Sequence, residues 1–316
     1  MNKRTIYLII FLVILAFLPF FLSSAWLSLA ITFLIFSIVA FSGDIILGRA
    51  GVFNMGHAIF FGLGAYATAI LNTHFHFSII STLPFAIILP LAIAYLIISP
   101  IIHLRGDYLL VATIGFNIIF EQVLSNNPFG LTGGPDGIFG IDLLSIFGFT
   151  FSSQMSIYYL AFGILVLSVL LLKALNRSKY GRALFYINKD EVAAKSMGIN
   201  ISQYKLFAFG LGASMAGLAG FVFALQNSAV SPESFNFMQS VMFFAIILVG
   251  GGASMPGILA GTFIMFILPE LFTSFKDSRY LIFGIAMIVT MILRPNGLLP
   301  MKFGDIPNFL KPKKEA

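Results

Sequence analysis

Apolar runs long enough to cross a lipid bilayer recur from one end of this 316-residue chain to the other. Such a crossing takes about 20 residues of helix. The hydrocarbon core offers no water, so backbone N–H and C=O groups must be paired within helices or closed barrels. Barrel strands alternate apolar and polar residues over about 10 positions, and no such alternation occurs here. The runs therefore predict an all-α, polytopic transmembrane helical bundle.

Ten runs of this kind predict ten spans in a single domain that covers residues 1–316. Their expected limits are 5–22, 25–42, 55–71, 79–102, 108–124, 156–175, 204–226, 237–250, 258–274 and 280–293. The first run resembles a secretory signal, but a second run follows at once. We therefore expect an uncleaved first helix.

The positions of the basic residues predict the orientation of these spans. If the N-terminus is cytoplasmic, sixteen of the 18 Lys and Arg residues fall in cytoplasmic segments, and only Lys276 and Arg279 fall outside. Cytoplasmic loops are enriched in Lys and Arg, so we expect both termini, including the basic tail 311–314, in the cytoplasm. A weak similarity between residues 53–66 and 235–250 favours an inverted repeat, because spans three and eight would then run in opposite directions.

Several kinds of chemistry find no support in the sequence. Cysteine is absent, which excludes disulfides and thiolate-bound metals. No P-loop sequence (GxxxxGK[ST]) occurs, so any ATP used must be bound by another chain. The four histidines are scattered along the chain, and the net charge of +6 is spread over short loops rather than over one face. We therefore expect no catalytic site, metal, cofactor or nucleic-acid partner.

Ionisable residues lie near the ends of the predicted spans rather than at their centres. Charges at the centre of a bilayer are costly and usually mark ion or proton pathways, and no carboxylate pair is placed there in this sequence. This pattern favours transport driven by another subunit over an ion-coupled secondary carrier, although sodium bound by backbone carbonyls stays open.

One hydrophilic segment, residues 176–203, carries seven of the chain's 30 charged residues between two apolar spans. Asn188 followed by Glu191 fits a variant of the capping box that begins a helix. Asp190 and Glu191 would then lie in the first turn, where the helix dipole favours anions. We predict a nine-residue helix over 189–197.

The C-terminal end of this short helix is also marked, because Gly198 is suited to the C′ position. Ala193, Ala194 and Met197 are expected on one side, as a small, flat face that could dock into a groove. Such a short helix is marginal alone in water, so a neighbour must hold it. Spacing alone leaves two interpretations open, a docking element and an ordinary solvated loop that sets orientation.

A series of motifs runs in order along nearly the whole chain. They are GRAGVFNMGHAIFFGLGAYATAIL (48–71), RGDYLLVATIGF (105–116), LTGGPDGIFGI (131–141), GRALFYINKDEVAAKSMGINISQYKLFAFGLGASMAGLAG (181–220), VSPESF (230–235), GGGASMPGILAGTFI (250–264) and RPNGLLP (294–300). In this combination the chain resembles the inner-membrane permeases of bacterial branched-chain amino-acid ABC importers. The TGGPDG loop and the length resemble the longer of the two permease types that pair in these importers. Permeases for urea and short-chain amides are very similar, which leaves the substrate open.

The resemblance implies a subunit that forms the translocation pathway in a bacterial inner membrane. It implies as partners a second permease, two cytoplasmic ATPase subunits that bind ATP, an extracytoplasmic substrate-binding protein and a small-molecule substrate. It also implies that segment 176–203 couples to the ATPase. The coupling residues are expected to be Asp190, Glu191, Ala193, Ala194 and Gly198.

Polar or glycine-rich breaks within apolar sequence are candidates for the translocation pathway, because irregular backbone at membrane depth must line a cavity or be buried in protein. The candidates are Asn54, His57, Thr132, Gly133, Gly134 and Asp136. The alternative is that these residues only shape turns and cap helices. The binding protein is expected to deliver its ligand to outer segments that include 125–155 and 230–235.

Overall fold

The computed structural model describes residues 11–104, 106–146, 149–150, 153–271, 279–294 and 297–299. Residues 11–17 are helical. The elements that follow are η1 (Leu18–Phe20), α2 (Ser24–Asp44), the π-helical turn η2 (Ile45–Arg49), α3 (His57–Thr73), α4 (Ile79–Ile101), α5 (Asp107–Ser125), η3 (Pro128–Gly130), η4 (Gly134–Asp136), β1 (Ile138–Phe139), β2 (Ser145–Ile146), β3 (Phe149–Thr150), α6 (Gln154–Arg177), α7 (Lys179–Lys189), α8 (Glu191–Ser196), α9 (Ile201–Asn227), β4 (Ala229–Val230), η5 (Pro232–Phe235), α10 (Phe237–Gly250), α11 (Met255–Thr262), the π-helical turn η6 (Phe263–Ile267), α12 (Leu268–Leu271) and α13 (Arg279–Leu293).

The predicted all-α, multi-pass membrane architecture is confirmed. Within the described residues, six helical segments are long and apolar enough to cross a membrane, and α3 and the stretches Phe11–Phe20 and Met255–Glu270 are shorter. The count of ten spans and the cytoplasmic location of the termini stay predictions. Residues 1–10, Lys276 and the basic tail 311–314, which enter that argument, lie outside the described residues.

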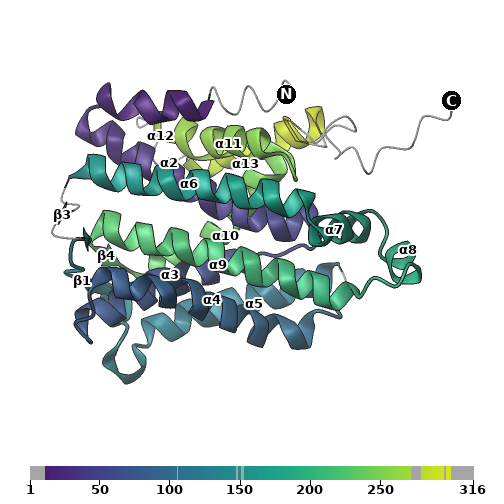
Figure 1. The fold of residues 1–316 in the computed structure, drawn as a ribbon, viewed down its shortest axis with the longest axis horizontal. Helices are drawn as coiled ribbons and strands as arrows, with labels where there is room; N and C mark the ends of the chain where they lie inside the picture. Colours follow the sequence, from purple (N-terminus) through teal and green to yellow (C-terminus); the bar gives the residue numbers. More distant parts are fainter. Residues whose placement is uncertain are drawn as a thin grey trace.

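Helix α9 runs through the middle of the bundle, with α2, α3 and α4 packed along it (Figure 1). Small residues allow this close approach. A Cβ on Gly64 of α3 would lie 2.1 Å from the Gly217 carbonyl oxygen of α9, and one on Gly220 would lie 2.1 Å from that of Phe61. Rows of small residues let helix backbones meet in this way in membranes, so Gly64 and Gly220 serve helix packing.

Burial separates an interior helix from helices at the periphery. Helix α2 is buried along most of its length, whereas α4 and α5 expose large apolar side chains such as Leu96 and Val111. Apolar side chains on the outside of a bundle are suited to contact with lipid or with another membrane subunit.

The two ends of the bundle differ in structure. At one end, β1 pairs antiparallel with β4 in the register Ile138 to Val230, so the predicted outer segments 125–155 and 230–235 adjoin each other. At the opposite end, α7 and α8 project beyond the long helices (Figure 1).

Candidate functional site

The hydrophilic segment 176–203 is mostly helical, whereas the sequence predicted a helix only over 189–197. Helix α6 continues to Arg177, and Ser178 then caps α7 by accepting a hydrogen bond from the Gly181 N–H at 3.1 Å. One face of α7 is buried through three apolar residues, Ala183, Leu184 and Ile187. Their spacing of one and four residues is that of a helix face, and it could have identified α7 from the sequence.

The second helix of this segment is α8, and its limits differ from those predicted. It covers Glu191–Ser196 rather than 189–197, and its N-cap is Asp190 rather than Asn188. One carboxylate oxygen of Asp190 accepts hydrogen bonds from the N–H groups of Val192 and Ala193, at 2.8 and 3.0 Å. Asn188 is unavailable as a cap because it lies in the last turn of α7 and donates to the Gly48 carbonyl.

The predicted end of the short helix is confirmed at Gly198. This residue has φ +80°, in the left-handed region that favours glycine. Its N–H donates to the Lys195 carbonyl at 3.0 Å, and the Ile199 N–H donates to the Ala194 carbonyl at 3.1 Å. These two bonds form a Schellman motif, so α8 is defined at both ends by local hydrogen bonds.

The three residues of the predicted docking face, Ala193, Ala194 and Met197, are not all available to a partner. Ala194 is fully buried, whereas Ala193 is exposed and Met197 is 61% exposed. Val192 is also exposed, at 67%. The physical reason is that a one-turn helix bound to the bundle through Ala194 presents its other sides outward. Helix α8 therefore carries exposed apolar side chains at the tip of a projecting element.

Two of the pathway candidates, Asn54 and His57, are buried where the chain passes from η2 into α3. The His57 Nε2 atom lies 2.6 Å from the Ser42 hydroxyl of α2, and His57 Nδ1 has no partner among the described residues. The Asn54 side chain accepts a hydrogen bond from the Gly56 N–H at 3.0 Å. Both side chains thus lie in the bundle interior beside a non-helical break.

Next to this break, Ser240 and Asn117 form a buried polar centre that the sequence analysis missed. The Ser240 hydroxyl of α10 accepts from the Ala58 N–H in the first turn of α3 at 2.9 Å, and donates to Asn117 Oδ1 of α5 at 2.7 Å. Asn117 in turn donates to the Phe235 carbonyl at 3.2 Å. Uncharged polar residues in the middle of apolar runs were the available signal.

The N-terminal parts of α3 and α10 therefore meet inside the bundle, and the two helices lead to opposite ends. Asn72, in the last turn of α3, hydrogen bonds with Asp142 beside β1. The turn that follows α10 instead contacts Asp44 through the Ala253 N–H. An inverted repeat requires this opposed arrangement, and the repeat itself stays a prediction.

The other pathway candidates lie in the loop between α5 and β1. The Thr132 hydroxyl donates to the Leu124 carbonyl at 2.7 Å, and the Asn127 side chain accepts from the N–H groups of Thr132 and Gly133. Gly133 and Gly134 have φ of +73° and +64°, and Asp136 is exposed. These contacts shape the loop, while a role in the pathway stays a prediction.

The two groups of pathway candidates are not brought together. Near the first group, the Met55 N–H donates to Thr113 of α5 at 3.1 Å, whereas Thr132 is bonded to Leu124 of the same helix. Eleven residues separate these two attachment points, which is roughly 16 Å along a helix. Any single pathway that includes both groups must therefore run along α5.

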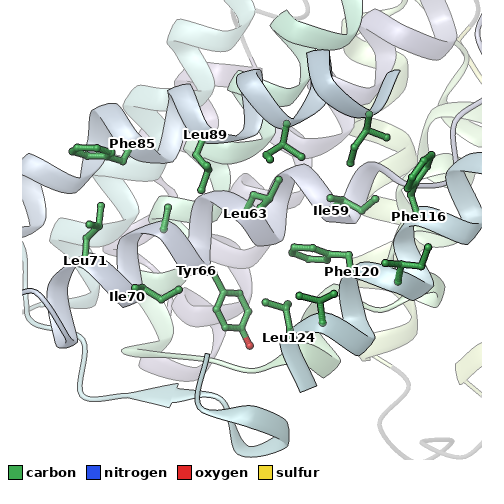
Figure 2. Close-up of a pocket in the computed structure, with 15 residues that line it drawn as sticks. Ile59, Leu63, Tyr66, Ile70, Leu71, Phe85, Leu89, Phe116, Phe120 and Leu124 are labelled. Carbon is green, nitrogen blue, oxygen red and sulfur yellow. The ribbon is translucent and has the colours of Figure 1, made fainter. Parts of the chain in front are cut away.

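A cavity of about 490 Å³, partly open at the periphery of the bundle, lies between α3, α4 and α5 (Figure 2). Its lining is apolar, with Leu63, Phe116 and Phe120 among the larger side chains. Tyr66 contributes the one side-chain hydroxyl, and this buried oxygen has no hydrogen-bond partner among the described residues. Such a space can take an apolar group, but it offers no counter-charge to an ammonium or a carboxylate.

The sequence is similar to those of known membrane transport proteins. Residues 25–291 match the family described as "Branched-chain amino acid transport system / permease component". The high-affinity branched-chain amino acid transport system permease protein LivM of Escherichia coli is 32% identical over 322 residues, which cover 95% of this chain and 76% of LivM.

Relatives of lower sequence identity also match most of this chain. A probable LivM of Methanocaldococcus jannaschii is 22% identical over 85% of this chain and 91% of its own length. The probable branched-chain amino acid transport permease LivH of the same organism is 26% identical over 69% of this chain and 72% of its own length. No solved structure matches the chain at a significant level. The family match covers most of the chain, and the chain therefore belongs to the family of permease components of branched-chain amino acid transport systems.

Proposed function

We propose that this protein is the pathway-forming permease subunit of an ATP-driven importer for branched-chain amino acids in a bacterial inner membrane. Its expected partners are a second permease subunit, two cytoplasmic ATPase subunits and an extracytoplasmic substrate-binding protein. The names of its relatives support the substrate class and, through the pair LivM and LivH, the second permease.

The observation that carries this proposal is the geometry of α7 and α8. This pair projects from one end of the bundle (Figure 1), is defined by the Asp190 cap and the Gly198 Schellman motif, and exposes Val192 and Met197. A protein partner docked at this tip would cover both apolar side chains. An ATPase docked there could move the tip when it closes around ATP.

The apolar cavity beside α5 agrees with a branched aliphatic substrate better than with urea, which has no apolar group. The charged ends of an amino acid would need partners elsewhere, and the buried polar groups at the break before α3, including Asn54 and His57, are candidates. Uptake of labelled leucine with competing isoleucine, valine, urea or acetamide separates these substrate classes. Competition by the two amino acids alone supports the proposal.

The docking function is tested with a charged residue on the exposed side of α8. Met197→Arg should leave the protein inserted in the membrane but prevent the ATPase subunits from co-purifying with it. The control is Phe129→Arg, which places the same charge at an even more exposed apolar position in the loop after α5. Retention of the ATPase by Met197→Arg, or its loss from both variants, would contradict docking at α8.

A further inference from the structure

A buried ion pair lies at the end of α2, close to α7. Asp44 is fully buried and Arg49 is 6% exposed, with Arg49 Nε 3.0 Å from Asp44 Oδ2. Burying two charges costs several kcal/mol for each ion unless pairing and further hydrogen bonds compensate. The residues between them form the π-helical turn η2, a conformation frequent at functional sites. The pair is thus costly to bury, and it lies at an irregular part of the most buried of the six described long helices.

The carboxylate of this pair also holds a second part of the chain. Asp44 Oδ1 accepts a hydrogen bond from the Ala253 N–H at 2.6 Å, in the turn between α10 and α11. Ala253 has φ +62°, which is strained for a residue with a side chain. Gly48 is required between them, since a Cβ there would lie 1.9 Å from Asp44 Oδ1 and 2.6 Å from the Ala253 nitrogen.

The guanidinium of the pair reaches the helix that leads into α7. Arg49 Nη1 donates to the side-chain oxygen of Asn176, in the last turn of α6. Among the described residues, Arg49 Nη2 is buried without a hydrogen-bond partner. The Asp44–Arg49 pair therefore connects the end of α2 both to the α10–α11 turn and to the start of the projecting segment.

The C-terminal end of α7 also contacts η2, the turn that contains Arg49. Asn188 Nδ2 donates to the Gly48 carbonyl at 2.8 Å, and Gly51 has no room for a side chain because a Cβ would lie 2.8 Å from Asn188 Oδ1. The last turn of α6, just before α7, and the last turn of α7 are thus both attached to residues 48–51. These residues lead directly into the break before His57, where α3 begins.

From these contacts we propose that Asp44 and Arg49 are positioning residues for energy coupling. They fix η2 so that a displacement of α7 and α8 is passed to the start of α3 and to the α10–α11 turn. This inference rests on the proposed function, because it takes the displacement to come from an ATPase docked at α8. A merely structural pair would stabilise the bundle without affecting how much substrate moves for each ATP hydrolysed.

The test uses the complete complex reconstituted in proteoliposomes with its ATPase subunits and binding protein. Two variants weaken the connection. Arg49→Lys keeps the charge but loses the planar, multi-donor geometry of the guanidinium, and Asn188→Ala removes the exposed end of the attachment without touching the buried pair. Thr32→Val is the control, since it removes a hydrogen bond that Gln226 of α9 donates to α2 at a position 12 residues before Asp44.

The expected result is that both test variants insert, retain the ATPase and hydrolyse ATP, while leucine transported per ATP falls by about tenfold, within the usual range of coupling between sites. Thr32→Val should leave this ratio unchanged. An unchanged ratio in either test variant, or equal losses of transport and hydrolysis in both, would overturn the inference while the docking function stands. If the unaltered chain retains no ATPase, the proposed function fails and the inference fails with it.

Discussion

Lys205, a largely buried residue in the second turn of α9, forms an ion pair with Glu191, the first residue of α8. The two residues are separated by the whole of α8 and by the Gly198 turn. The pair therefore closes the projecting segment back onto the long helix at the middle of the bundle. Glu191 is one-third exposed, so water can solvate its carboxylate, whereas the buried Lys205 ammonium relies on Glu191 for its counter-charge.

This difference predicts an unequal result when either partner is removed. Glu191→Gln leaves the Lys205 ammonium buried without a counter-charge, whereas Lys205→Met leaves a carboxylate that water can reach. We expect Glu191→Gln to lower the free energy of unfolding by about 2 kcal/mol more than Lys205→Met does. The double variant should recover much of the loss. Thermal unfolding in nanodiscs measures this cycle, and strictly additive losses would contradict the pair.

Gly198 gives a second prediction, based on its backbone. Gly198→Pro cannot adopt φ +80° and removes the N–H that donates to the Lys195 carbonyl. Asn adopts the left-handed conformation more readily than other residues with a side chain, and nothing lies within 4 Å of a Cβ at this position. Gly198→Pro should abolish ATP-driven uptake in inserted protein, while Gly198→Asn should retain most of it. Similar uptake by both variants would show that the Schellman motif is dispensable.

The buried polar centre predicts a loss of stability. Ser240→Ala leaves the Ala58 N–H and the Asn117 side-chain oxygen without their partner, at a cost of about 1–3 kcal/mol for a buried group. Ser37→Ala is the matched control, because the Ser37 hydroxyl is buried with no partner among the described residues. Unfolding midpoints should fall for Ser240→Ala only. Equal midpoints would show that the centre is not a support of the bundle.

Removing the hydroxyl of Tyr66 should raise stability or leave it unchanged, in contrast to the loss expected for Ser240→Ala. Since this buried group has no partner in the described part of the chain, Tyr66→Phe removes a desolvation cost of about 1–3 kcal/mol. The variant should unfold at the same or a higher temperature, with leucine uptake unchanged. A fall in uptake at unchanged stability would mean that the hydroxyl contacts the ligand in the cavity (Figure 2).

The long helices could be predicted from the sequence because a membrane span needs about 20 consecutive, mostly apolar residues in a helix. The cap of α8 could not be chosen from local pattern alone, since Asn188 and Asp190 are both good N-caps. Tertiary contact decided between them, because Asn188 is held by the Gly48 carbonyl of a segment 140 residues away.

The candidate site could be predicted only where its structure depends on residues close together in the sequence. Gly198 was identified because a C′ glycine acts through its own backbone. The pair of Asp44 and Arg49, and the polar centre of Ser240 and Asn117, depend on contacts between distant helices. Asp44 and Arg49 were placed near the end of a span, but nothing in their spacing shows that the π-helical turn η2 buries both.

The central claim, that another subunit drives transport through α7 and α8, is tested most directly by the energy source of uptake. The measurement is leucine uptake into proteoliposomes that contain the permease pair and binding protein, with and without the ATPase subunits, and with and without a protonophore. The account predicts uptake that requires ATP and the ATPase subunits and persists with the protonophore. Uptake that continues without the ATPase subunits and collapses with the protonophore would contradict it.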